Sequence, residues 1–152
     1  MPTAPRIISP MQHTWLFYAL LSAAAAALIP IFAKLGMKDI DSNLATTVRS
    51  LVMTLFLITV CLWSGLANQL KTIHTKAMTM ILLSGLAGAL SWLFYFRAIK
   101  IGQVSQVAPI DKLSMPLGIL LAVHVLGERP TVINWLGIAL IAGGAYLATM
   151  KG

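Results

Sequence analysis

The sequence has 152 residues, of which 59% are hydrophobic and 10% are charged, and its formal net charge is +7. Soluble domains are about 45–50% apolar and about 25% charged, and a soluble core of this size could not bury so much apolar surface. The composition therefore excludes an ordinary soluble domain and indicates an integral membrane protein. The basic residues are dispersed through short connections, which favours contact with anionic lipid headgroups over binding of nucleic acid.

Residues 1–13 are rich in proline and precede the first apolar run, so we expect a disordered N-terminal tail. A secretory signal is the alternative, because Arg6 and the alanine run at 23–27 imitate parts of one. The apolar segment continues to Ala33, which favours an uncleaved helix. Met11 is an alternative start of the chain.

Five long stretches with little or no charge predict membrane-spanning helices. A spanning helix needs about 20 residues at ~1.5 Å rise per residue, and the fourth stretch reaches that length only when it is counted from Pro109. Backbone groups in hydrocarbon must bond internally, and the alternation of a barrel strand is absent from the sequence. Residues 14–152 are therefore predicted to form one domain, an all-α integral membrane bundle of five transmembrane helices, at Trp15–Ala33, Leu44–Gly65, Met78–Ala98, Pro109–Leu126 and Ile133–Thr149.

Local signals mark several ends of these helices. Asp41 and its polar neighbours can cap the second helix, and Thr131 can start the fifth. Gly102 fits the turn between the third and fourth helices. Helix parity leaves four basic residues on the side of the N-terminal tail and seven on the other. So weak a bias hardly orients the chain and permits insertion in both directions.

Parity also places five ionisable residues from four predicted helices in one half of the membrane. A charge within a spanning segment costs at least ~2.5 kcal/mol on insertion scales, so such residues tend to face a cavity, form pairs or serve a substrate route. Pro109 and Pro116 flank two of them and loosen the fourth helix, and broken helices are typical of transporter sites. The five residues are Lys34, Arg49, Arg97, Asp111 and Lys112.

The surplus of basic residues in this cluster indicates an anionic or carboxylate-bearing solute. Asp111 is the candidate for proton or ion coupling, and two aromatic residues of the third helix are candidate walls of the site. The predicted substrate-binding residues are Lys34, Arg49, Trp92, Tyr95, Arg97 and Lys112. The alternative is structural: Asp111 pairs with an arginine, the lysines extend to headgroups, and the aromatic residues contact lipid.

Gly137 and Gly144 lie seven residues apart in the fifth predicted helix and would suit contact with a second subunit. Contact within one chain is the alternative. Cys61 stands alone, and the histidines show no ligand spacing, so neither a metal site nor a cofactor is expected.

Four stretches carry a resemblance that covers the whole apolar region. They are AKLGMKDIDSNLATTVRS, SGLAGALSWLFYFRAIKIG, VAPIDKLSMPLG and LGERPTVINWLGIALIAGGAYL. Together they resemble a single-domain, five-helix member of the EamA family within the drug/metabolite transporter superfamily. Larger members contain two such halves in inverted orientation, which implies that a single half works as a homodimer, with an antiparallel arrangement as one option. The glycines of the fifth helix also resemble the dimer helix of small multidrug resistance transporters. However, the acidic residue that those proteins carry in their first helix is absent here, where Lys34 is the only charged residue.

The resulting hypothesis is a secondary transporter, not an enzyme, for a small polar metabolite or drug-like solute. It would act by alternating access as an exporter or exchanger, in contact with membrane lipid, in a bacterial plasma (inner) membrane. Two alternatives stay open. The chain could be a non-transporting membrane subunit, or a lipid-carrier flippase subunit that acts with a partner protein.

Overall fold

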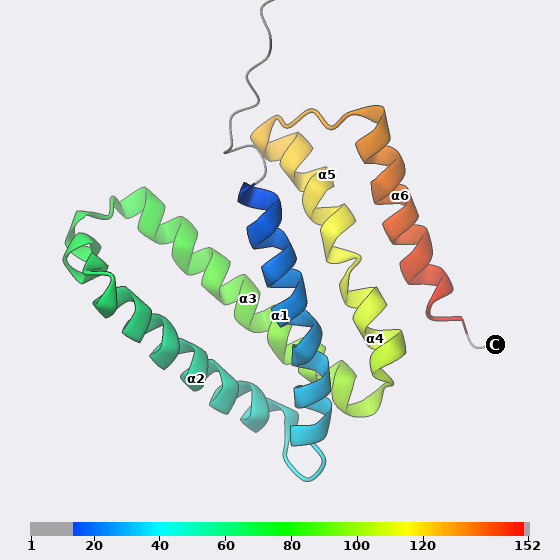
Figure 1. The fold of residues 1–152 in the computed structure, drawn as a ribbon, viewed down its shortest axis with the longest axis horizontal. Helices are drawn as coiled ribbons and strands as arrows, with labels where there is room; N and C mark the ends of the chain where they lie inside the picture. Colours follow the sequence, from blue (N-terminus) through cyan, green and yellow to red (C-terminus); the bar gives the residue numbers. More distant parts are fainter. Residues whose placement is uncertain (1–13, 151–152) are drawn as a thin grey trace, which may run out of the picture.

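A computed structural model of the protein describes residues 14–150, and the predicted tail at residues 1–13 lies outside the described part. Within that part the structure is all-helical, which confirms the all-α fold class (Figure 1). The elements in chain order are α1 (Thr14–Gly36), α2 (Ser42–Trp63), the 3-10 helix η2 (Leu66–Thr72), α3 (Thr75–Ile101), α4 (Val104–Asp111), α5 (Ser114–Leu126) and α6 (Val132–Leu147).

Four helical segments are long and apolar enough to cross a bilayer. They are α1, α2, α3 and the consecutive pair α4 and α5, which together run from Val104 to Leu126. Helix α6 has 16 residues, or about 24 Å at 1.5 Å per residue, which is shorter than the ~30 Å hydrocarbon core. By this criterion the structure supports four of the five predicted spans.

Two helix starts follow the capping signals in the sequence. The Asp41 carboxylate accepts hydrogen bonds from the backbone N–H groups of Asn43 at 2.8 Å and Leu44 at 3.4 Å, so α2 begins at Ser42. The Thr131 hydroxyl oxygen accepts from the N–H of Asn134 at 3.3 Å at the start of α6. These bonds satisfy N–H groups that the first turn of a helix leaves without partners.

The predicted start of the fourth helix at Pro109 is wrong. Helix α4 begins at Val104 and contains Pro109, and the helical path is interrupted at Lys112 and Leu113, between the two prolines. Pro116 has no N–H to donate to the Lys112 carbonyl. That carbonyl instead accepts a tighter bond from the N–H of Met115, at 3.0 Å. The break is therefore a direct consequence of a proline early in α5.

Helices α1, α2 and α4 all contact α3. Helix α2 packs along α3, α1 contacts both α3 and α4, and α6 contacts α4 and α5. Helices α1 and α2 diverge from their connecting loop, as Figure 1 shows. The buried apolar cluster lies near that loop and consists of Ala33, Met37, Phe96 and Ile99.

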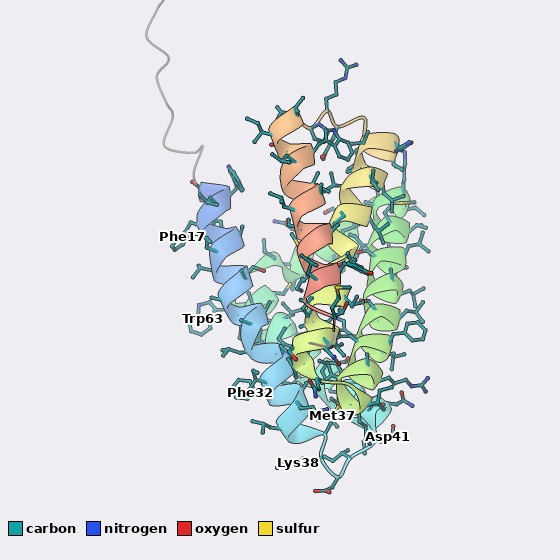
Figure 2. All side chains as sticks on the ribbon, turned by 90° about the vertical axis from the view of Figure 1, so that its right-hand side faces the viewer. Phe17, Phe32, Met37, Lys38, Asp41 and Trp63 are labelled. Atoms are coloured by element: carbon teal, nitrogen blue, oxygen red, sulfur yellow. The ribbon has the colours of Figure 1, made fainter. Side chains whose placement is uncertain are left out.

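Most large apolar side chains lie on the outside of the helices, where a bilayer would solvate them (Figure 2). Phe32 is 65% exposed and Trp63 is 91% exposed. Trp15, Trp63 and Trp135 all lie near helix ends on the side of the α1 N-terminus. Such a distribution matches an aromatic belt at one membrane interface.

Candidate functional site

Arg49 of α2 lies over the aromatic face of α3. Its Cζ atom is 3.6 Å from the centroid of the Trp92 ring and 5.5 Å from that of Phe96. A guanidinium in this position is attracted by the ring electrons. Between residues 14 and 150 the one ion pair joins Asp111 and Lys112, so no carboxylate of that part lies within 4 Å of Arg49. The stack holds the cation in place and leaves the edges of the guanidinium able to donate hydrogen bonds.

Trp92 belongs to an aromatic cluster on one side of α3. The centroid of its ring lies 5.8 Å from that of Tyr95 and 5.7 Å from that of Phe96, and the centroids of Tyr95 and Phe96 are 6.3 Å apart. All three pairs meet edge to face, an arrangement that the ring quadrupoles favour. The spacing of three and four residues on a helix brings the Trp92 ring to those of Tyr95 and Phe96, which are themselves adjacent in sequence.

A cavity of about 200 Å³ lies at the break between α4 and α5. Lys112 Nζ is 3.3 Å from Asp111 Oδ2, and the two side chains are 57% and 30% exposed. Two aromatic residues of α3 form another wall of the cavity, and α1 provides small and apolar residues. The lining residues are Ala26, Ile29, Ser91, Trp92, Tyr95, Asp111, Lys112 and Ser114.

Lys34, which the sequence groups with the substrate-binding residues, makes its contacts elsewhere. Its ammonium donates hydrogen bonds to the backbone carbonyls of Ile99 at 2.7 Å, Lys100 at 3.2 Å and Gly102 at 2.8 Å. These carbonyls belong to the C-terminal end of α3, where a cation is favoured by the helix dipole. Lys34 therefore joins α1 to the α3–α4 turn.

Arg97 also lies apart from the cavity at the helix break. Its side chain is exposed and does not line that cavity. Its charge is felt instead at Asp41. The pKa of that carboxyl is lowered chiefly by the backbone N–H of Asn43, with smaller contributions from Leu44, Lys100 and Arg97. The structure thus brings Asp111 and Lys112 together with the aromatic residues, and leaves Lys34 and Arg97 outside.

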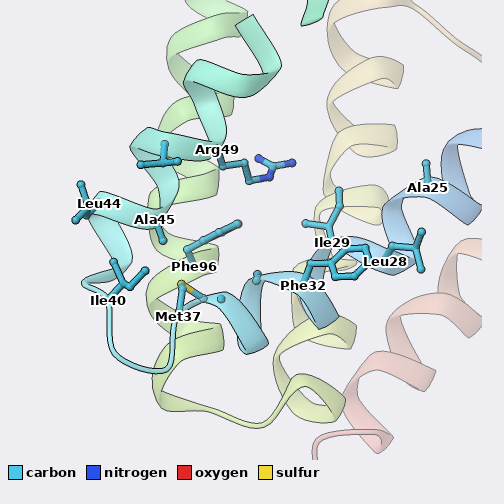
Figure 3. A pocket seen from close by; sticks show the side chains of 13 residues that line it. Ala25, Leu28, Ile29, Phe32, Met37, Ile40, Leu44, Ala45, Arg49 and Phe96 are labelled. Carbon is cyan, nitrogen blue, oxygen red and sulfur yellow. The ribbon is translucent and has the colours of Figure 1, made fainter. Parts of the chain in front are cut away.

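A larger groove between α1 and α2 was not predicted. It has a volume of about 660 Å³. In Figure 3 the Arg49 side chain extends from α2 past Phe96 toward α1. Ile29 lines both this groove and the cavity at the helix break. The one signal in the sequence was Arg49 itself, because the other lining residues are ordinary apolar residues of spanning helices.

Two of the three glycines of α6, the pair predicted at a subunit contact, have open surroundings. A Cβ atom placed on Gly137 or Gly144 would meet no atom within 4 Å outside its own helix backbone. Neither glycine is therefore needed for close contact within this chain. Among residues 14–150 no group of three His, Cys, Asp or Glu side chains could hold a metal ion.

Comparison with known proteins identifies relatives over nearly the whole chain. Residues 13–150 match the EamA-like transporter family. A protein of Sinorhizobium sp described as "Uncharacterized transporter in cobO 3'region" is 43% identical over 137 residues, which cover 90% of this chain and 97% of that protein. No solved structure matches the chain. The similarity includes every helix described above and both cavities.

Proposed function

Because the chain belongs to the EamA-like transporter family and is a multi-pass membrane transporter, we propose that it is a secondary transporter of a small polar solute bearing a carboxylate. Transport would proceed by alternating access, as an exporter or exchanger. The observation that carries this proposal is the cavity at the α4–α5 break, where an ion pair faces two aromatic residues. A broken helix with charged residues inside a membrane bundle is a common form of transporter site.

The charged and aromatic residues of the cavity, and Arg49 next to it, have proposed roles. Lys112 is the counter-ion for the solute carboxylate, Trp92 and Tyr95 form the wall, and Arg49 holds Trp92 from the α2 side and adds positive charge. A solute anion would compete with Asp111 for the Lys112 ammonium, since the two side chains are already in contact. We propose Asp111 as the residue that couples a proton or ion to solute transport, because it shares this ion pair with Lys112.

We further propose five spans, with α6 as the fifth, and a homodimer in a bacterial plasma (inner) membrane. A cavity of about 200 Å³ is smaller than the usual ~300–1,000 Å³ of a ligand site, which is consistent with completion by a second copy. The open surface at Gly137 and Gly144 offers a place for close helix contact.

An antiparallel dimer requires both orientations of the chain in the membrane. Reporters of membrane topology fused after residue 152 should then give signal from both sides. Signal from one side alone would contradict the antiparallel arrangement. That result would still be consistent with a parallel dimer.

The solute site can be tested by thermal unfolding of the purified protein with a panel of carboxylate metabolites. A ligand at about 100 times its dissociation constant adds ~2.7 kcal/mol to the stability of the bound state. We expect at least one metabolite to raise the unfolding temperature, and Lys112→Ala and Asp111→Asn to reduce that rise. Lys38→Ala and Asp39→Asn are matched controls, because both residues lie exposed in the loop between α1 and α2. A panel without effect on the folded protein would favour a non-transporting or lipid-handling subunit.

A further inference from the structure

The groove between α1 and α2 combines apolar walls with one cation. Both helices contact α3 and diverge from their connecting loop, which leaves the groove between them (Figure 1). Of its 13 lining residues Arg49 is the one that carries a charge. The walls include Phe32 of α1, Val48 of α2 and Phe96 of α3, and Met37 lies at the loop end. The volume of about 660 Å³ lies within the usual ~300–1,000 Å³ of a ligand site.

Arg49 can bind an anionic ligand, because residues 14–150 supply no carboxylate to its guanidinium. Its guanidinium is stacked on Trp92 at 3.6 Å and has no carboxylate of residues 14–150 within 4 Å. Stacking uses the flat face of the guanidinium, while its five N–H donors point outward in the guanidinium plane. A carboxylate can accept two of these in parallel. An anion at this point would complement the one charge of the groove.

The depth of Arg49 restricts the kind of anion. Arg49 is seven residues after the first residue of α2, or about 10 Å along the helix. A bulky phospholipid headgroup would have to descend below the interface to reach it. A single carboxylate attached directly to an apolar body would not.

We propose that the groove binds a single-chain amphipathic carboxylate, with the carboxylate on Arg49 and the apolar body along Phe32, Val48 and Met37. The ligand would enter from the bilayer, since the groove lies between two diverging spanning helices. This inference rests on the proposed function in one respect, the use of Arg49 as a source of positive charge for an anion. The site itself is different, because Ile29 is the one residue that lines both the groove and the cavity at the helix break.

The test is binding of radiolabelled decanoate to the full chain in nanodiscs of zwitterionic phosphatidylcholine, at about pH 8, where the carboxylate is ionised. Empty nanodiscs give the partition background. We expect saturable binding that unlabelled decanoate displaces and that decanol or decyltrimethylammonium does not. Arg49→Gln should weaken binding at least about tenfold, the loss expected for a hydrogen-bonded charge pair, and Arg49→Lys should weaken it less. Arg97→Gln is the matched control, because Arg97 lines no part of the groove.

A second pair of variants keeps Arg49 and its contact with Trp92. Val48→Trp fills the groove and should abolish decanoate binding, whereas Val52→Trp, one turn further along α2 and outside the lining, should not. This pair decides the outcome if Arg49→Gln fails to fold. Decanoate binding that is unchanged in Val48→Trp, or displaced equally by decanol, would overturn the proposal. Loss of a dimer in Val48→Trp without decanoate binding to the native chain would also overturn it and would identify the groove as a subunit contact.

Failure of this site can be separated from failure of the proposed function. Asp111→Asn changes the cavity at the helix break and should leave decanoate binding unchanged. If decanoate binds but no metabolite raises the unfolding temperature in a way that Asp111→Asn reduces, the proposed solute site alone is refuted. If a metabolite raises the unfolding temperature in that way but decanoate does not bind, the carboxylate site in the groove alone is refuted.

Discussion

Replacement of Lys34 by methionine should destabilise the protein through the loss of three hydrogen bonds to backbone. Methionine keeps an unbranched stem of similar length and a similar helix propensity, so the change removes little besides the ammonium. The carbonyls of Ile99, Lys100 and Gly102 at the end of α3 would lose their donor. In addition, α1 would lose its polar link to the α3–α4 turn.

The size of the effect follows from the geometry of these bonds. A hydrogen bond to a charged group contributes about 1.5–3 kcal/mol, and partly exposed bonds belong at the low end of that range. The bonds to Ile99 at 2.7 Å and Gly102 at 2.8 Å are part-buried, whereas the bond to Lys100 at 3.2 Å is exposed. Two bonds at about 1.5 kcal/mol give a loss of about 3 kcal/mol, with little from the third. At about 2–4 °C per kcal/mol, the unfolding temperature should fall by roughly 6–12 °C.

The assay is thermal unfolding in detergent, followed by circular dichroism, with Lys38→Met as the matched control. Lys38 lies four residues further along the chain in the same region, is exposed, and makes no side-chain hydrogen bond within residues 14–150. Its replacement should change the unfolding temperature by little. Equal unfolding temperatures for the two variants would refute the capping role of Lys34.

Two further predictions concern the ends of helices. Gly102→Ala should destabilise the protein by about 1–3 kcal/mol, because the new Cβ would lie 2.8 Å from Cγ2 of Val107. Gly118→Ala is the control and should cost nothing, since its Cβ would meet no atom within 4 Å. Equal unfolding temperatures for the two variants would contradict the contact with Val107. The folded-state pKa of Asp41 is lowered, chiefly by the N–H of Asn43, so its stabilising effect is present above about pH 4 and is lost as the pH falls through the folded pKa. In a thermal unfolding series from neutral to acidic pH, Asp41→Asn should therefore lose less stability on acidification than the native chain does, and a parallel loss would refute the capping role.

The sequence predicted α1, α2 and α3 well, because each contains a long stretch without charge and hydrocarbon requires such a stretch to be helical. The ends were less accurate. Helix α1 continues to Gly36 and α3 to Ile101, past Lys34 and Lys100, since a charge near the interface limits the apolar span without stopping the hydrogen-bond ladder. The break at Lys112 could be placed only approximately. The position of the break depends on Pro116, which has no N–H to donate to the Lys112 carbonyl.

Some residues of the candidate site could be predicted from the sequence, and others could not. Arg49, Trp92 and Tyr95 could be grouped from the sequence, because parity places them in one half of the bundle. The contact of Lys34 with carbonyls 65 to 68 residues away could not, since no local pattern reports which helix end lies beside another. The groove between α1 and α2 was missed for a related reason. It arises from the angle between two helices, and their individual compositions carry no sign of it.

The most direct measurement is of electrical currents from proteoliposomes on a solid-supported membrane, on addition of carboxylate metabolites with and without a proton gradient. If solute binding at the α4–α5 break is coupled to Asp111, at least one metabolite should give a proton-dependent current in the native chain. Asp111→Asn should fold normally and give no such current, while Asp39→Asn should resemble the native chain. An undiminished, proton-dependent current in Asp111→Asn would contradict coupling through Asp111.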